Sequence, residues 1–255
     1  MQIDWAGLSD VGLQREHNED SFCVLPEYDL FVVADGMGGH RAGDLASRLA
    51  TSTIHQFFHL TANEDATWPF HFDPSKSRAE NRLVSGIKLA NKRIFEASVT
   101  NQAVQGMGTT VVAVLFERDS GKVLVAHVGD SRAYLIRDSD IKLVTRDHSL
   151  LNDYLEVMPD MPPEQVEELP RNVITRALGM QDVVTVDIQD LAPEAGDRWL
   201  LCSDGLNGML KDEQILAEVM EAGADLEAGV NQLIERANAA GGEDNTTVVL
   251  CGCQA

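Results

Sequence analysis

The chain has 255 residues, of which 44% are hydrophobic, and its formal net charge is −21 at pH 7. This length and apolar content suffice for a hydrophobic core, and no linker-like tract divides the chain, so we expect one domain over residues 1–255. The negative charge argues against nucleic acid or an anionic membrane as a partner, because both require basic surfaces. The first residues lack the basic and apolar regions of a signal peptide, and no apolar run reaches transmembrane length, which predicts a cytoplasmic protein.

Three strand-like segments open the chain, at residues 3–8, 21–25 and 29–34. Helical periodicity then predicts one helix over residues 42–59 and a second over residues 77–98. Each helix has a single apolar stripe, so each is expected to bury one face.

A β region follows, with strands expected at residues 108–116, 122–128, 131–137 and 141–144. Short turn signals join consecutive strands and predict antiparallel pairing. Later strands are expected at residues 185–189, 198–202 and 246–251, with helices near residues 212–221 and 226–239. Strands in blocks and helices in blocks predict the α+β class rather than alternating βαβ units.

Two segments between these elements are expected to be irregular. Residues 61–78 carry large aromatic side chains between the two long helices, and residues 152–172 carry four prolines among acidic residues. Long ordered loops often serve as lids or binding surfaces. For residues 61–78 the favoured alternative is that the aromatic side chains cover the edge of the core.

The four cysteines form no C-x-x-C pair, and a cytoplasmic chain of this size does not need disulfides. We therefore expect buried free thiols. Because Cys202 lies two residues before Asp204, the alternative is that its oxidation disturbs a site there.

Two short motifs superficially suggest other sites. The glycine-rich segment Asp35–His40 follows a strand and precedes a helix, but it lacks the GxxxxGK[ST] pattern of a P-loop. His55 and His59 have the spacing of a zinc-protease helix, but Gln56 replaces the glutamate that would act as base. An ordinary helix end is the favoured interpretation of the histidine pair.

Acidic and phosphate-seeking residues recur at strand ends beside glycine or asparagine. A charge is costly to bury without a partner, and a glycine lets the backbone approach a ligand closely. Several such ends converging would supply oxygen ligands, which suit Mg²⁺ or Mn²⁺ and disfavour zinc. The residues are Arg15, Glu19, Asp20, Asp35–Gly36, Asp130, Asp204–Gly205 and Asp244–Asn245.

The same residues lie in motifs that follow one another in a familiar order. The motifs are SDVGLQREHNED at 9–20, VADGMGGH at 33–40, GTT at 108–110, VGDSR at 128–132, NVITRALG at 172–179, LCSDG at 201–205 and GEDNTT at 242–247. With them the sequence resembles the metal-dependent serine/threonine protein phosphatases of the type 2C family, from about residue 3 to residue 251. The resemblance implies a four-layer α/β/β/α sandwich, in which two central antiparallel β-sheets are flanked by helices.

The resemblance also implies a centre of two Mn²⁺ or Mg²⁺ ions and a third, weaker ion. By motif position Asp35 would bridge the two main ions. Asp204 and Asp244 would hold one of them, and the carbonyl of Gly36 would bind the other.

Further site residues follow from the same motifs. Glu19 and Asp20 match outer ligands that act largely through water, and Asp130 matches the ligand of the third ion. Arg15 matches the guanidinium that grips the phosphate, a planar fork that holds two oxygens better than lysine does. The alternative is that Arg15 only pairs with Glu16 or Glu19.

The implied reaction is the direct attack of a metal-bridging hydroxide on phosphorus, without a phosphoenzyme. Many eukaryotic relatives have histidine after the Asp-Gly pair, whereas this chain has Met37, as the bacterial branch does. His40 is the candidate general acid for the leaving oxygen because histidine titrates near neutrality. A metal-bound water is the alternative donor, and His40 could instead cap the loop.

Residues 148–172 correspond to the mobile flap of the family, the expected place of substrate choice. The predicted function is a protein phosphatase that acts on phosphoserine and phosphothreonine and opposes a bacterial serine/threonine kinase, with phosphorylated proteins as partners. One alternative is a catalytically weak, phosphatase-like regulatory or binding domain, which the complete set of carboxylates disfavours. An acidic cation-binding scaffold ranks last because it leaves Arg15 unexplained.

Overall fold

The computed structural model of the chain describes residues 2–38, 42–63, 68–170 and 172–254. His40, the candidate general acid, lies outside the described residues. All other site residues named above lie within them.

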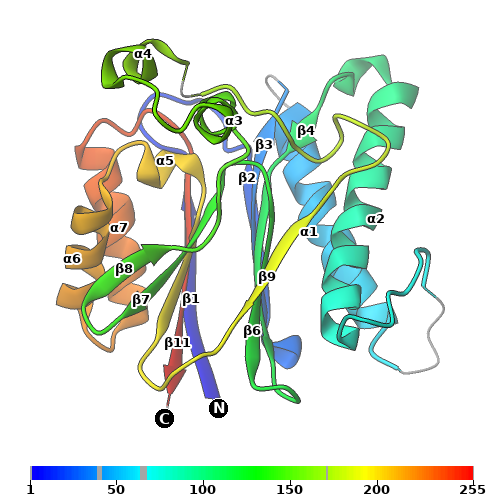
Figure 1. Ribbon diagram of the computed structural model, residues 1–255, viewed down its shortest axis with the longest axis horizontal. Coiled ribbons are helices and arrows are strands. Elements are labelled where there is room, and N and C mark those ends of the chain that lie inside the picture. The colour runs from blue at the N-terminus through cyan, green and yellow to red at the C-terminus, as the bar shows by residue number, and fades with distance from the viewer. Residues whose placement is uncertain (1, 39–41, 64–67, 171, 255) are drawn as a thin grey trace.

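Two antiparallel β-sheets form the centre of the molecule (Figure 1). The first has the strand order β1 (Gln2–Asp10), β11 (Thr246–Gln254), β10 (Arg198–Cys202), β7 (Arg132–Arg137) and β8 (Asp140–Leu143). The second has the order β2 (Asp20–Leu25), β3 (Leu30–Met37), β5 (Val111–Glu117), β6 (Lys122–Val128) and β9 (Asp187–Leu191), and the short β4 (Gly108–Thr109) also pairs with β3.

Helices cover the outer face of each sheet (Figure 1). The second sheet is covered by α1 (Ala42–Leu60) and α2 (Arg78–Thr100), and the first by α5 (Asp204–Asn207), α6 (Asp212–Ala222) and α7 (Leu226–Ala239). Two short 3₁₀ helices, η1 (Pro26–Tyr28) and η2 (Gln102–Val104), lie in connections. This arrangement confirms the predicted α/β/β/α sandwich.

Three layers of apolar packing hold the sandwich together. Strand β3 shows how they form, because Phe31 and Val33 point into the core between the sheets, while Leu30, Val32 and Ala34 point toward α1 and α2. A central strand covered on both faces reads as a continuous apolar run rather than an alternating one. Between the sheets, the rings of Phe116 and Trp199 meet edge to face at 6.3 Å and join β5 to β10.

The flap differs from the sequence expectation. The sequence predicts an irregular segment over residues 152–172, but α3 (Leu150–Val157) begins just before it and α4 (Pro163–Glu168) lies within it. Helix α3 starts at the N-cap Ser149, and its eight residues are fewer than the window over which helical periodicity can be recognised. Proline at the start of α4 is compatible with the first helical turn.

The other predicted elements are present, with shifts at their ends. The strand expected at 108–116 is interrupted at Thr110, and the strand expected at 185–189 begins at Asp187. The described parts of residues 61–78 contain no helix before Arg78, as expected. There Trp68 packs edge to face on Phe57 of α1, which agrees with a loop that covers the core edge.

All four cysteines are free, and Cys202, Cys251 and Cys253 are buried. His55 and His59 are exposed on α1, in agreement with an ordinary helix surface. Within the part of the chain that the structure describes, no helix is both long and apolar enough to cross a membrane.

Candidate metal centre and phosphate site

A cleft of about 540 Å³ opens where the ends of the two sheets meet. Loops from both sheets form it, so residues more than 200 positions apart in the sequence share its walls. The lining residues are Arg15, Glu16, His17, Glu19, Asp35, Gly36, Met37, Gly38, Ile174, Asp204, Asp244 and Asn245.

The second sheet brings two of the predicted carboxylates together. Asp20 at the start of β2 is paired with Asp35 near the end of β3. The main chain of Asp35 is held by threonines, since its N–H donates to Thr110 Oγ1 at 3.0 Å and its carbonyl accepts from Thr109 Oγ1 at 2.8 Å. These bonds fix the backbone and leave the carboxylate for the cleft.

The first sheet supplies two more of the predicted carboxylates. Asp204 follows β10 and opens α5, and Asp244 precedes β11. Between them Ser203 joins the two sheets, because its hydroxyl donates to Asp20 Oδ2 at 2.7 Å and accepts from the N–H of Thr247 at 2.9 Å.

Crowding and burial disturb the ionisation of these carboxyl groups. Burial first, and the neighbouring carboxylates second, raise the pKa of Asp35 well above its ordinary value. Burial also raises the pKa of Asp20 to about 7, against the hydrogen bonds from Ser203 and Thr247. The pKa of Asp204 is raised by burial and by Asp244. Keeping all of these carboxyl groups ionised therefore costs free energy unless a positive charge is bound among them.

Asp130 lies close to this cluster. It is buried in the turn between β6 and β7, and burial with repulsion from Asp204 and Asp147 raises its pKa to about 7. Among the described residues, neither Asp130 nor Asp20 lines the cleft itself. Their carboxylates lie behind its wall, in electrostatic contact with Asp35.

The donor set fits divalent cations. Buried oxygens Oδ1 of Asp20 and Oδ1 of Asp130 find no hydrogen-bond partner in the described structure. Buried polar atoms are normally satisfied, and a bound cation would satisfy these two. The ligands on offer are oxygens, which suits Mg²⁺ or Mn²⁺ rather than zinc.

A close approach of backbones shapes the floor of the cleft. A Cβ atom on Gly36 would lie 2.1 Å from the carbonyl oxygen of Gly43 and 2.5 Å from that of Glu19. Only glycine fits between the end of β3 and the first turn of α1. The N–H of Gly36 also donates to the carbonyl of Glu19 at 3.1 Å.

Arg15 stands at the rim of the cleft and is half exposed. Its Nη2 lies 2.6 Å from Asp244 Oδ2, and its Nε donates to the carbonyl of Glu243 at 3.4 Å. Its ion-pair partner is thus a residue far along the chain, not the adjacent Glu16. The guanidinium thus lines the cleft beside Asp244.

Asn245 organises the loop that carries Arg15. Its Nδ2 donates to the carbonyls of Val11 and His17 at 2.9 and 3.0 Å, and its Oδ1 accepts from the N–H of Glu19 at 2.7 Å. The sequence indicates Asn245 and Ser203 only as members of motifs. A sequence alone does not distinguish a serine or asparagine that caps a helix or forms a turn from one that bridges two segments. Only the position of these two residues in the motifs could have predicted their role.

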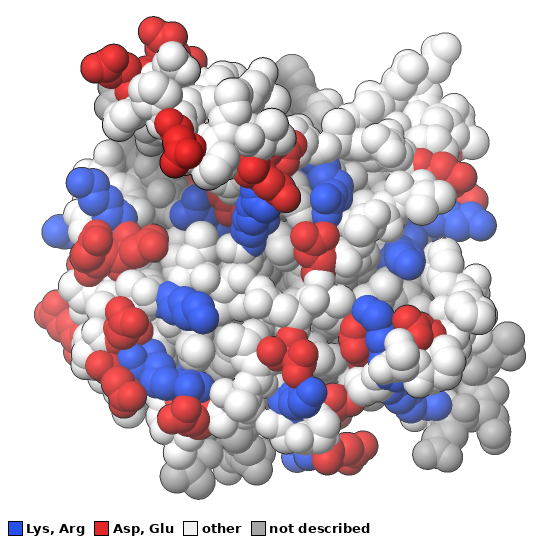
Figure 2. Space-filling model, in the orientation of Figure 1, with Lys and Arg blue, Asp and Glu red and all other residues white. Residues whose placement is uncertain are grey.

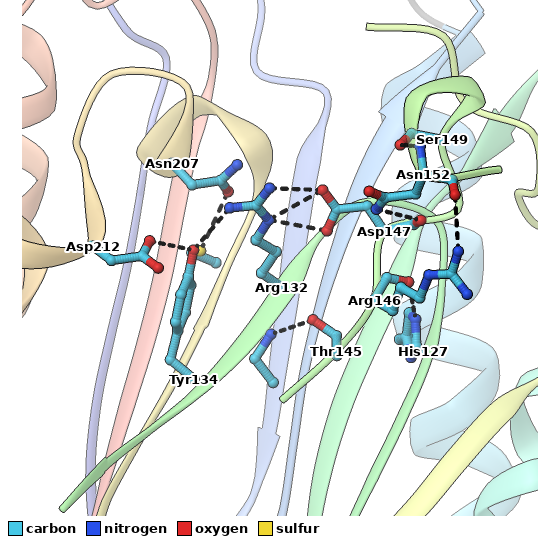
Figure 3. Close-up of polar contacts among 12 residues, drawn as sticks. His127, Arg132, Tyr134, Thr145, Arg146, Asp147, Ser149, Asn152, Asn207 and Asp212 are labelled. Atoms are coloured by element: carbon cyan, nitrogen blue, oxygen red, sulfur yellow. Dashed lines mark hydrogen bonds and ion pairs between the residues drawn. The ribbon is translucent and has the colours of Figure 1, made fainter. Parts of the chain in front are cut away.

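A second polar network lies under the flap (Figure 3). The guanidinium of Arg132 donates to Asp147 through Nε and Nη2, at 2.9 and 2.7 Å, and through Nη1 to the hydroxyl of Tyr134 at 3.1 Å. Asn152 of α3 donates to the carbonyl of Asp147 at 3.0 Å. These contacts fasten the start of the flap to β7, next to the turn that carries Asp130.

Comparison with known proteins gives a consistent result. The family model described as protein phosphatase 2C matches residues 14–238. The chain is 35% identical over 250 residues to a serine/threonine phosphatase stp of Listeria monocytogenes, covering 95% of this chain and 92% of that protein.

Solved structures agree with the sequence relatives. The serine/threonine phosphatase PstP of Mycobacterium tuberculosis superposes with a TM-score of 0.84 at 32% identity, over 99% of both chains. The catalytic domain of PstP in complex with two manganese ions superposes with a TM-score of 0.81, also at 32% identity and over 99% of both chains. The chain belongs to the protein phosphatase 2C family.

Proposed function

We propose that this phosphatase hydrolyses phosphoserine and phosphothreonine in proteins, with two divalent cations held in the cleft. The observation that carries the proposal is the meeting of four aspartates from two sheets, with one arginine at the rim. The relatives named as serine/threonine phosphatases support the substrate class.

In this proposal Asp35 would serve both cations, Asp204 and Asp244 would hold one, and the carbonyl of Gly36 would hold the other. Glu19 and Asp20 act as outer ligands, and Asp130 serves a third, weaker ion. Bound Mn²⁺ or Mg²⁺ supplies an acidified water and neutralises phosphate charge. Manganese is supported by the PstP domain that carries two such ions.

Arg15 is assigned to the phosphate. A half-exposed guanidinium that faces the carboxylate cluster can donate two parallel hydrogen bonds to phosphate oxygens. If Asp244 held a cation, its carboxylate would have a second counter-charge, and Arg15 would be available to the phosphate.

The proton for the leaving oxygen is assigned to His40, on its sequence position alone. His40→Ala should lower turnover of a phosphopeptide more than turnover of p-nitrophenyl phosphate, whose leaving group needs less protonation. Unchanged turnover of both substrates would remove His40 from the mechanism.

The decisive experiment is hydrolysis of p-nitrophenyl phosphate with and without metal. We expect activity with Mn²⁺ or Mg²⁺, loss of activity with chelator, and a fall of roughly 10²–10³-fold in Asp35→Asn and Asp204→Asn. Asp119→Asn, in the exposed turn after β5, is the matched control and should keep full activity. Activity that survives chelation would refute the proposal, and its absence with metal would favour a binding domain instead.

We also propose a cytoplasmic location and a serine/threonine kinase as the opposing enzyme. The acidic surface and the buried free thiols support the location. Cell fractionation, and phosphoproteomics of a deletion strain with and without the kinase, test these two points.

A further inference from the structure

A cluster of titratable side chains outside the cleft joins the two ends of the flap. It contains His127 on β6, His148 before α3, Arg176 after the flap and Asp187 at the start of β9. Potential ligand atoms of His127, His148 and Asp187 lie within 4.8 Å of one another, as in a metal site.

The geometry argues against a metal ion there. The rings of His127 and His148 are stacked, with centroids 4.7 Å apart and planes 9° from parallel. An imidazole binds a metal in the plane of its ring, and one ion cannot lie in two separate parallel planes. Arg176 Nη1 also lies 2.9 Å from His148 Nε2, so a cation already occupies the space.

The hydrogen bonds instead define a fixed arrangement of protons. The N–H of Gly129 donates to His148 Nδ1 at 3.0 Å, so the proton of the neutral ring is assigned to Nε2. Arg176 Nη1, 2.9 Å from Nε2, is then a second donor beside it and not its hydrogen-bond partner, and Asp187 is the acceptor that both donors share. His148 Nε2 faces Asp187 Oδ2 at 3.3 Å, and Arg176 Nη1 lies 2.6 Å from Asp187 Oδ1. Asp187 therefore accepts from one side chain at each end of the flap.

The backbone around this cluster leads directly to the cleft. The N–H of Thr175 donates to the carbonyl of His148 at 2.9 Å, and the N–H of Leu150 donates to the carbonyl of Val173 at 2.9 Å. Ile174 lies between these two bonds, bridges to Ser149 and lines the cleft. The position of one cleft wall thus depends on the base of the flap.

Besides the contacts that Asp147 and Arg146 make with Asn152 at its start, the described part of the flap has little buried surface. Helix α3 buries none of its residues, and Val157 and Met158 at its end are exposed. The described part of the flap carries acidic residues on its outer surface, and Figure 2 shows them gathered over α4. A weakly packed segment is positioned mainly by the bonds at its two ends.

We propose that Asp187, with His148 and Arg176, is a positioning latch that fixes the base of the flap for the binding of phosphoprotein substrates. This inference rests on the proposed phosphatase function. A small aryl phosphate needs only the carboxylate cluster and Arg15, whereas a phosphopeptide is long enough to extend from the cleft onto the flap. The latch therefore acts on KM for the peptide and not on the hydrolysis step.

The test compares two aspartates of the same strand. Asp187→Asn removes the carboxylate charge from the latch, and Asp190→Asn removes the partner of Lys122 at 2.6 Å, further along β9. We expect Asp187→Asn to raise KM for a phosphothreonine peptide by roughly 3–30-fold. Turnover of p-nitrophenyl phosphate should change less than about twofold in both variants.

Two further measurements separate a latch from a general structural role. Hydrogen–deuterium exchange over residues 149–158 should be faster in Asp187→Asn than in wild type or Asp190→Asn. The double variant Asp187→Asn with Arg176→Gln should be little worse than Asp187→Asn alone, because both changes break the same contact.

The latch proposal is wrong if Asp187→Asn and Asp190→Asn have the same KM for the phosphothreonine peptide and the same rate of hydrogen–deuterium exchange over residues 149–158. It is also wrong if Asp187→Asn loses activity equally on both substrates. Failure of the proposed function looks different, because the wild-type protein itself would then lack metal-dependent hydrolysis of p-nitrophenyl phosphate.

Discussion

Asp130 illustrates the cost of preparing a cation site from buried carboxyl groups. Burial and the charges of Asp204 and Asp147 raise its pKa to about 7, and burial raises that of Asp20 to a similar value, from 3.8 in both cases. Between pH 3.8 and about 7 these two carboxyl groups therefore bind more protons in the metal-free folded state than in the unfolded chain. The contribution of these two groups to the free energy of unfolding therefore falls as pH rises through this window.

Replacing Asp130 should weaken that pH dependence. In the presence of chelator, we expect the urea concentration at the unfolding midpoint of the wild-type protein to decrease as the pH is raised from about 5 to about 8. The decrease should be smaller in Asp130→Asn, which has one buried carboxyl group of raised pKa fewer. Asp119→Asn, at an exposed position, should follow the wild type. Equal slopes for Asp130→Asn and the wild type would show that Asp130 does not titrate in this range.

At the scale of elements, the junction of β3 and α1 fixes the floor of the cleft. A Cβ atom placed on Gly36 would approach the carbonyl oxygen of Gly43 to 2.1 Å, which leaves no room for a side chain. Any larger residue must push α1 away from β3 and so move the Gly36 carbonyl that is proposed to bind a cation.

Gly36→Ala should therefore destabilise the protein by about 3 kcal/mol and weaken metal uptake. Gly252→Ala is the matched control, because its Cβ would meet Leu226 at an ordinary 3.6 Å. Denaturant unfolding and calorimetric titration with Mn²⁺ measure the two effects. A Gly36→Ala protein as stable as Gly252→Ala would contradict the packing argument.

The elements that the sequence pattern locates are those that bury a face. Helices α1 and α2 have apolar stripes against the second sheet, and periodicity predicts both within about two residues of their ends. Helix α3 has only eight residues, and α4 has only six and begins with proline, so both are too short for this periodicity to be recognised. The break at Thr110 follows from its hydroxyl, which accepts from the N–H of Asp35 and is engaged with Ser131 Oγ at 2.6 Å.

Some residues of the candidate site can be predicted from the sequence pattern, whereas the contacts between them can be seen only in the folded structure. Charged residues at the ends of apolar runs have few roles other than ligand binding, so the sequence indicated Asp35, Asp204 and Asp244. The pairing of Arg15 with Asp244 joins positions 229 apart, and no local pattern encodes it. The bridge from Ser203 to Asp20 depends equally on the packing of two sheets.

At the scale of the whole molecule, the carboxylates come from both sheets. Asp20 and Asp35 belong to the second sheet, while Asp204 and Asp244 extend from the first. A cation held between them ties the two halves of the sandwich together. It also offsets part of the net charge of −21.

Metal binding should therefore stabilise the entire fold. With free Mn²⁺ about a hundredfold above its Kd, the gain is about 2.7 kcal/mol, or a rise in Tm of roughly 5–10 °C. Thermal unfolding with Mn²⁺ and with chelator measures it. Asp35→Asn should lose the rise, and a wild-type Tm that ignores Mn²⁺ would contradict binding between the sheets.

The antiparallel pairing of β1 with β11 sets Gln2 opposite Gln254, and the two chain ends lie at the pole of the molecule opposite α3 and α4 (Figure 1). Joining these neighbours by a short linker and reopening the polypeptide in the exposed turn at 119–121 would yield a circular permutant with new termini at that same distant pole. Reporter proteins or surface anchors could then be fused there while leaving the entrance for substrates clear.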